Sequence, residues 1–185
     1  LLWQQQPVRV RFAVAVPVAA PAGPHAVRVR LVVAGLGVGE LSFVLNVMPN
    51  AAPDAPLGDA HAARRMLHSA YAAYAAADRD EVLRRLNTLH QVAPGLDVFV
   101  DAPQLRTDPA WRDRIQHEMG RRERLFLFWS AAAAESPWID YEWRLSLRTR
   151  GPAALDAVLL QPPRDAPLPA ELADLADAVQ VAGAP

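Results

Sequence analysis

The chain has 185 residues, 52% of them hydrophobic, which suffices for one ordinary domain with a buried core and a small additional piece. Its formal net charge of −1 offers no basic surface for nucleic acid, so we expect no nucleic-acid partner. The absence of cysteine excludes disulfides, thiolate metal sites and cysteine nucleophiles, and the absence of lysine excludes Schiff-base chemistry and a P-loop.

No apolar run reaches the roughly 18 residues that a membrane-spanning helix needs, and the chain shows no secretory leader. A chain without cysteine also fits a reducing compartment. We therefore expect a cytoplasmic protein that makes no contact with a membrane.

Residues 1–50 predict a small antiparallel β module. Apolar and polar residues alternate in segments 8–16 and 27–31, and segment 39–47 follows after a Gly-rich turn. Three strands make a thin core, so we expect either part of a sandwich or a sheet that packs on something else. One face of this sheet, either solvated or facing an anionic partner, would carry Arg9, Arg11, Arg28 and Arg30.

Residues 51–68 are predicted to be a proline-rich linker with a possible short helix, although the Ala-rich stretch 60–77 can equally hide a buried strand. From there to residue 185, strands and helices alternate, which indicates a parallel sheet covered on both faces. The expected elements are helix 79–91 capped by Asp78, strand 96–100, helix 111–120, strand 124–129, helix 136–149, strand 155–160, helix 170–175 and a last strand at 178–182.

The most informative stretch leads from the strand that ends before Ser130 into a helix. Ser136 has the features of a helix N-cap, and Pro137 suits the first helical position. Trp138 and Glu142 are four residues apart and therefore lie on one face of this helix. An aromatic plane beside a carboxylate, near the mouth of a parallel sheet, is a suitable place to hold and cleave a nucleoside.

With this order of elements, residues 69–185 resemble a bacterial TIR domain. The resemblance is carried by segments 70–75 with Asp78, 81–85, 98–106 leading to Trp111, 127–130, and 136–138 with Glu142. It implies that segment 71–74 is the first strand. The implied fold is a flavodoxin-like α/β domain with a five-stranded, mostly parallel sheet, preceded by the small antiparallel β module of residues 1–50.

Some TIR domains cleave NAD+ at the nicotinamide–ribose bond, and the resemblance implies such an activity here, in bacterial signalling or anti-phage defence. Nicotinamide leaves as a neutral molecule, so one carboxylate that stabilises an oxocarbenium-like transition state can suffice. By resemblance that catalytic carboxylate is Glu142. NAD+ would be the substrate, with no cofactor. The substrate-binding residues would be Trp138, Tyr74, Asp101, Arg106, Trp129 and Ser130.

Each of these roles has a structural alternative. Tyr74, Asp101 and Trp129 are at or just after the carboxyl ends of their predicted strands, where open α/β sheets bind ligands, but they can equally pack or cap. Arg106 can meet a pyrophosphate or be a solvated loop residue. The five histidines show no ligand spacing, so we expect no metal site.

Two alternatives also stand for the helix that begins at Ser136. Glu142 can be an exposed residue paired with Arg144 or Arg148, and Trp138 can belong to the core of an amphipathic helix.

The expected partners are NAD+ and other TIR domains, in a homo-oligomer in which a neighbour's loop, residues 101–110, completes the site. The alternative function is a non-catalytic TIR scaffold for homotypic protein–protein interaction. Ala73 stands where the family usually has serine, and residues 107–110 lack the usual Pro-Gly, which favours the scaffold. The intact Ser-Pro-Trp motif with Glu142 favours the enzyme.

Overall fold

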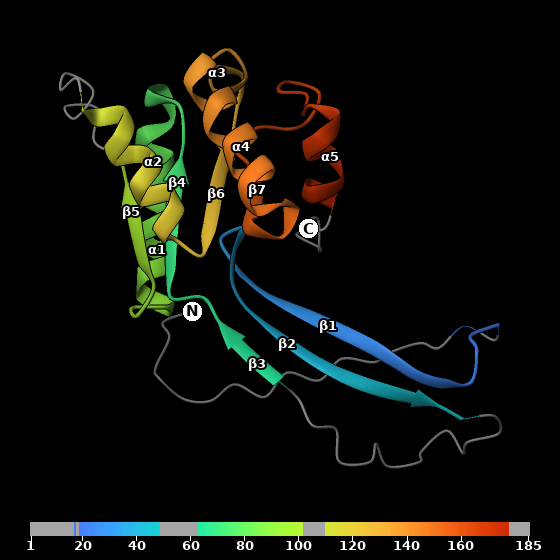
Figure 1. Cartoon of the computed structure of the whole chain (residues 1–185). Coiled ribbons are helices and arrows are strands. Elements are labelled where there is room, and N and C mark those ends of the chain that lie inside the picture. Colours follow the sequence, from blue (N-terminus) through green and yellow to red (C-terminus); the bar gives the residue numbers. More distant parts are fainter. Residues whose placement is uncertain (1–16, 18, 49–62, 102–109, 178–185) are drawn as a thin grey trace. The chain divides into compact units, whose positions relative to one another are not determined.

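The computed structural model describes residues 17, 19–48, 63–101 and 110–177 (Figure 1). Contacts within the chain define two compact units, one formed by residues 1–31 with 39–66 and the other by residues 32–38 with 67–185. The first unit contains an antiparallel sheet and the second an α/β fold. The predicted strands at 8–16 and 178–182 lie outside the described residues.

The antiparallel sheet has the strand order β1-β2-β3, with β1 Gly23–Val33, β2 Leu36–Val47 and β3 Ala63–Met66. β2 and β3 run antiparallel, with Gly39 opposite Met66. On β1, Arg28 is exposed while its neighbours Val27 and Val29 are half-buried, as period-two alternation predicts. The small antiparallel sheet expected from the sequence is therefore confirmed.

β3 corrects one prediction. The sequence predicts a linker with a possible short helix over residues 51–68, whereas the structure has a strand at Ala63–Met66. Ala63, Arg64 and Arg65 are all exposed, so this strand has no apolar alternation for a sequence pattern to reveal. Its conformation is set by backbone pairing with the edge of β2.

The turn between β1 and β2 belongs to the α/β unit. It consists of Ala34 and Gly35, whose φ angles of 52° and 85° are both positive, as in a two-residue type I′ hairpin turn. A Cβ atom at Gly35 would lie 3.3 Å from Cγ1 of Val158, so the close approach also favours glycine. Leu36, directly after the turn, is completely buried in the core of the same unit. We call residues 32–38 the hairpin tip.

The α/β unit is built on a parallel sheet with the strand order β5-β4-β6-β7. Its strands are β4 Ser69–Ala73, β5 Asp97–Val100, β6 Arg124–Trp129 and β7 Leu155–Leu159. β4 is central, with β5 on one side and β6 on the other. The α/β fold with a parallel sheet is confirmed, with four strands among the described residues and the predicted fifth outside them.

Helices cover both faces of this sheet (Figure 1). α1 Arg79–Val92 packs on one face, and the hairpin tip packs into the same core. The other face is covered by α2 Trp111–Arg121, α4 Pro137–Arg150 and α5 Ala170–Asp177. The described residues of this unit also form two short 3-10 turns, η1 Ala76–Asp78 and η3 Pro152–Ala154.

Strand β6 serves both cores and is accordingly apolar on both faces. Phe126 and Phe128 pack in the core of α1, while Leu125 and Leu127 pack in the core of α4. This alternation places the core at the centre of the sheet and leaves the two ends of the strands for polar residues.

Two serines cap helices. Oγ of Ser136 accepts a 3.4 Å hydrogen bond from the N–H of Ile139 at the start of α4, as predicted. Oγ of Ser130 accepts a 3.0 Å hydrogen bond from the N–H of Ala133. Ser130 is the N-cap of a short helix, α3 Ala131–Ala134, in the Ala-rich connection between β6 and α4.

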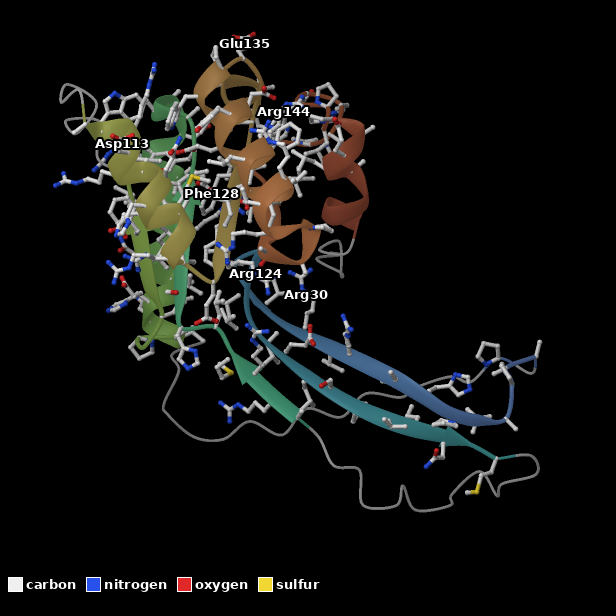
Figure 2. The ribbon with its side chains drawn as sticks, viewed as in Figure 1. Arg30, Asp113, Arg124, Phe128, Glu135 and Arg144 are labelled. Carbon is white, nitrogen blue, oxygen red and sulfur yellow. The ribbon has the colours of Figure 1, made fainter. Side chains whose placement is uncertain are left out.

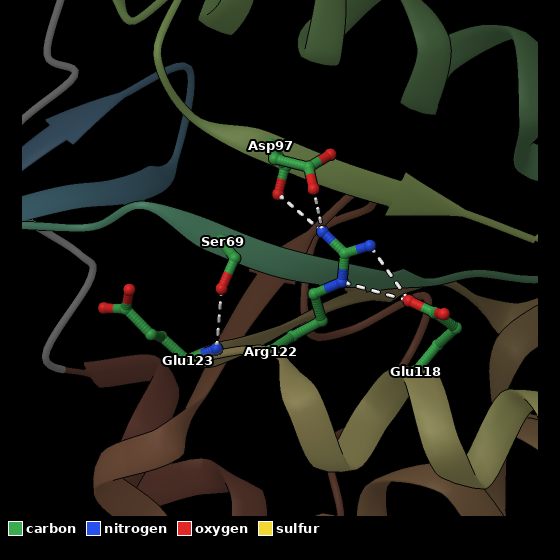
Figure 3. A network of polar contacts seen from close by, with 5 residues as sticks. All are labelled: Ser69, Asp97, Glu118, Arg122 and Glu123. Carbon is green, nitrogen blue, oxygen red and sulfur yellow. Dashed lines mark hydrogen bonds and ion pairs between the residues drawn. The ribbon is translucent and has the colours of Figure 1, made fainter.

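Arg122 ties the end of α2 to the start of β5 (Figure 3). Its guanidinium donates to Oε2 of Glu118 at 2.9 Å and forms an ion pair with Asp97. The Arg122 side chain is 15% exposed and lies over the ring of Phe99. Burial by itself would lower the pKa of Arg122, but the hydrogen bonds with Glu118 and Asp97 raise it above the ordinary arginine value. The network therefore holds α2 against the amino end of the sheet.

Candidate functional site

Polar residues gather at the carboxyl ends of the parallel strands. Tyr74 follows β4, Asp101 follows β5 and Ser130 follows β6. All three are buried, and the Tyr74 hydroxyl donates a 2.9 Å hydrogen bond to the backbone oxygen of Asp101. Since β4 lies between β5 and β6, these residues occupy adjacent strand ends, where open α/β sheets bind ligands.

Glu142 projects from α4 toward the sheet. Its side chain is 1% exposed, and its Oε1 accepts a 2.6 Å hydrogen bond from the hydroxyl of Tyr71 in β4. Ile139 and Trp143 are buried on the same helix, so the carboxylate interrupts an apolar stripe. A carboxylate at such depth needs hydrogen-bond donors, because burial of an unpaired charge is costly.

The burial of Glu142 excludes the structural alternative predicted for this residue. Arg144 does not pair with it: its Nε donates to Oδ1 of Asp140 at 2.8 Å, and its Nη1 donates to Oε1 of Glu171 at 3.3 Å. Arg148 is exposed. The alternative of a solvent-exposed Glu142 paired with Arg144 or Arg148 is therefore wrong.

Trp138 lies at the start of α4 in an aromatic group with Trp111 of α2 and Tyr141 of α4. The ring centroids of Trp138 and Trp111 are 4.3 Å apart, and those of Trp138 and Tyr141 are 5.2 Å apart. The indole ring is half-buried against the core of α4. Its Nε1 is buried and has no hydrogen-bond partner among the described residues. Trp138 therefore packs against other aromatic rings and also has an indole N–H that donates no hydrogen bond within the described residues.

A sequence model of the family described as TIR domain matches residues 71–182, more than half of the chain. The chain belongs to the TIR domain family. The resemblance seen in the motifs is therefore confirmed, together with the flavodoxin-like α/β fold that it implies. No curated protein and no solved structure gives a significant match to the chain.

Membership of the TIR family carries two consequences. The family covers both NAD+-cleaving enzymes and scaffolds, and its members engage in homotypic TIR–TIR interactions.

In the part of the chain that the structure describes, no helix is long and apolar enough to cross a lipid bilayer. The same residues contain no group of three or more His, Asp or Glu side chains arranged to hold a metal ion.

In this TIR domain Ser130 connects the end of β6 to η1. Its hydroxyl donates a 2.5 Å hydrogen bond to Oδ2 of Asp78, in addition to capping α3. Asp78 occupies the N-cap position of α1, as the sequence predicts, but its side chain makes no cap hydrogen bond. A tertiary partner 52 residues away engages the carboxylate instead.

The structure places Trp129 in the hydrophobic core. Its side chain is 3% exposed, and its Nε1 donates a 3.3 Å hydrogen bond to the backbone oxygen of Pro167. Trp129 therefore anchors the segment after β7, which is the packing role that was the alternative to substrate binding. Arg106 lies outside the described residues.

Three residues of this region were not among the predicted site residues: Tyr71, Trp111 and Tyr141. Tyr71 and Tyr74 are both visible in the sequence, but an odd spacing along a strand puts them on opposite faces. Which face meets α4 is decided by the packing of that helix, and only then does Tyr71 become the partner of Glu142.

Proposed function

We propose that this TIR domain cleaves NAD+ at the nicotinamide–ribose bond, with Glu142 as the essential carboxylate. The observation that carries the proposal is the buried hydrogen bond between Tyr71 of β4 and Glu142 of α4. A purely structural α4 would be more stable with an apolar residue at this position, because a buried carboxylate is costly to desolvate.

The chemistry needs little beyond a positioned carboxylate. Nicotinamide leaves a cationic ring as a neutral molecule, so no general acid has to protonate it. The ribose then develops oxocarbenium character, which Glu142 stabilises electrostatically or traps covalently. Tyr71 orients the carboxylate through its 2.6 Å hydrogen bond. Attack by water gives ADP-ribose, and attack by a substrate hydroxyl or ring nitrogen gives a cyclised product.

The remaining groups suit the other parts of NAD+. The aromatic group around Trp138 offers a flat surface and an N–H donor for nicotinamide or ribose. Tyr74, Asp101 and Ser130 lie at the strand ends, close to where ribose hydroxyls would bind. Arg106 is proposed for the pyrophosphate on the basis of its charge.

The burial of the Glu142 carboxylate provides a way to regulate the proposed NAD+ cleavage. At 1% exposure the carboxylate is shielded in the single chain, so NAD+ must displace covering side chains to reach it. We propose that TIR–TIR self-association supplies this change and forms a cytoplasmic homo-oligomer that acts in bacterial signalling or anti-phage defence.

The test is nicotinamide release from NAD+ by the concentrated protein, with and without a crowding agent. Glu142→Gln is compared with Glu135→Gln, which removes an exposed carboxylate after α3 (Figure 2). We expect turnover in the parent and in Glu135→Gln, and a loss of about 100-fold or more in Glu142→Gln. Equal turnover in all three proteins would reject Glu142 as the essential group.

A non-catalytic TIR scaffold is the second candidate function. It is favoured by the same burial of Glu142 and by Ala73 on β4, which stands where the family usually has serine. No nicotinamide release at concentrations where light scattering detects assembly, with the protein folded, would support the scaffold over the enzyme.

A further inference from the structure

A cavity of about 440 Å³ lies between α2 and α4, toward the amino ends of the parallel strands. Its lining includes Arg124, the first residue of β6, and Arg150, the last residue of α4. Figure 2 shows Arg124 at the far end of the α/β unit from Glu135, which follows α3. The cavity is therefore distinct from the strand ends that carry Tyr74 and Ser130.

Part of the cavity lining is apolar. This part consists of Tyr71, Met119, Leu125 and Leu145, together with the glycine at position 120 of α2. A Cβ atom added at Gly120 would meet no other atom within 4 Å, so the space beside this residue is open. These residues suit the apolar body of a ligand.

The lining also contains hydrogen-bond donors without acceptors. Ser146 is 3% exposed, and its Oγ has no partner among the described residues. Nε of Arg124 is buried and also has no hydrogen-bond partner among the residues that the structure describes. A buried donor without an acceptor is destabilising, and such groups in proteins usually meet a ligand, an ion or water.

The charges at this end favour an anion. Arg124 is compensated by Asp156, whose Oδ1 lies 3.1 Å from its Nη1. Arg150 instead donates to two backbone oxygens, those of Met119 at 3.1 Å and Glu123 at 2.7 Å. Burial lowers the pKa of Arg150, and the positive charge of Arg124 lowers it further, against a smaller opposing effect of the Glu123 carboxylate. An anion between the two guanidiniums would relieve this repulsion.

We propose that this cavity binds a small molecule with an apolar body and one anionic head group, and that Arg124, Arg150 and Ser146 contact the head group. The body lies along Met119 and Leu145, and the phosphate or carboxylate oxygens accept from the guanidiniums and the serine hydroxyl. Tyr71 lines the cavity and also holds Glu142, so this ligand touches a residue of the proposed active site. The binding itself requires no step of NAD+ cleavage.

Isothermal titration calorimetry of the full chain tests the proposal with 1-naphthyl phosphate, 1-naphthoate, neutral 1-naphthol and inorganic phosphate. We expect one site per chain and at least about tenfold tighter binding of an anionic naphthyl compound than of naphthol, as one charged hydrogen bond provides. The tighter of the two anionic compounds identifies the head group as phosphate or carboxylate. Naphthol binding as tightly as both anions, or no binding of either anion at millimolar concentration, overturns the proposal.

Variants separate a binding role from a structural one. Ser146→Ala removes an unpartnered hydroxyl, so we expect weaker anion binding with an unchanged or higher melting temperature. Arg150→Gln should abolish the preference for anions over naphthol, while Arg148→Gln, an equal change of charge at an exposed position of α4, should preserve it. Unchanged anion binding in Ser146→Ala and Arg150→Gln overturns the assignment of these contacts. Nicotinamide release plays no part in these readouts, so failure of the NAD+ proposal would not affect them.

Discussion

The hydroxyl of Tyr71 donates a 2.6 Å hydrogen bond to Oε1 of Glu142, joining the central strand β4 to helix α4 through a buried carboxylate. The two residues are 71 positions apart in the chain, and both are about 1% exposed. The bond stabilises the Glu142 carboxylate within the apolar stripe of α4, which the fold requires. It also fixes the orientation of this carboxylate, which the proposed chemistry requires.

Replacement of Tyr71 by phenylalanine should destabilise the protein. Tyr71→Phe leaves the Glu142 carboxylate without this donor, and we expect a loss of about 1–3 kcal/mol in the free energy of unfolding, measured by urea denaturation. The control is Tyr141→Phe, which removes the partly exposed hydroxyl that accepts from Gln116 and should change stability by about 0.5 kcal/mol or less. Equal effects of the two changes would contradict a special role for the buried bond.

The hairpin tip gives a second prediction. Gly35 has a φ of 85° and leaves only 3.3 Å between an added Cβ and Cγ1 of Val158. Gly35→Ala should therefore lower the free energy of unfolding by about 1–3 kcal/mol, through backbone strain and displacement of the tip from the core. Gly95→Ala is the matched control, because an added Cβ there meets nothing within 4 Å, and its melting temperature should stay near that of the parent. A harmless Gly35→Ala change would mean that the tip is not part of the α/β core.

Ser130 and Ser136 differ in what their hydroxyl groups do. Ser130 caps α3 and also donates to Asp78, whereas Ser136 caps α4 through a longer 3.4 Å bond. Ser130→Ala should cost about 1–3 kcal/mol in the free energy of unfolding, and Ser136→Ala about 1 kcal/mol or less. Asp78→Asn should lower stability in the parent but have little further effect in Ser130→Ala. Additive losses in this double-mutant cycle would show that the two side chains act independently.

The ion pairs of α1 predict a pH dependence. Nε of Arg85 donates a 2.7 Å hydrogen bond to Oε1 of Glu81, and this bond lowers the pKa of the Glu81 carboxyl. The positive charges of Arg85 and Arg84 lower the pKa further. A lowered folded-state pKa stabilises the fold above the ordinary glutamate pKa of about 4.3, and this contribution is lost as the pH falls through the lower, folded-state value. In Glu81→Gln the free energy of unfolding should therefore fall less steeply than in the parent as the pH is lowered below about 4.3. Near pH 7 the substitution should change the free energy of unfolding by no more than a surface ion pair contributes. If the stability of Glu81→Gln fell with decreasing pH just as that of the parent does, Glu81 would not contribute to the pH dependence of stability.

The elements that the sequence predicted best are those with local signals. Helix α4 begins at Pro137 after the Ser136 cap, as expected, and β6 has the predicted bounds because the apolar run 125–129 ends before Ser130. The strand β4 was ambiguous by composition, since alanine favours helix, and the family resemblance was needed to recognise it. β3 carried no pattern at all.

The candidate site was predicted in part. Trp138 and Glu142 share a helix face because of their spacing, which the chain order alone establishes. The burial of Glu142 and its bond to Tyr71 required the packing of α4 on β4. The same packing placed Trp129 in the core and exchanged the predicted helix cap at Asp78 for a bond to Ser130.

The sequence by itself determined most strands and helices of the α/β unit, the N-cap of α4 and the membership of the TIR family, because these depend on residues close together in the chain or on motifs in a fixed order. The tertiary structure alone decided which side chains face each other: Glu142 with Tyr71, Ser130 with Asp78, and the hairpin tip with the core of α1. Such contacts join distant segments, and burial selects among partners that hydrophobic periodicity cannot distinguish.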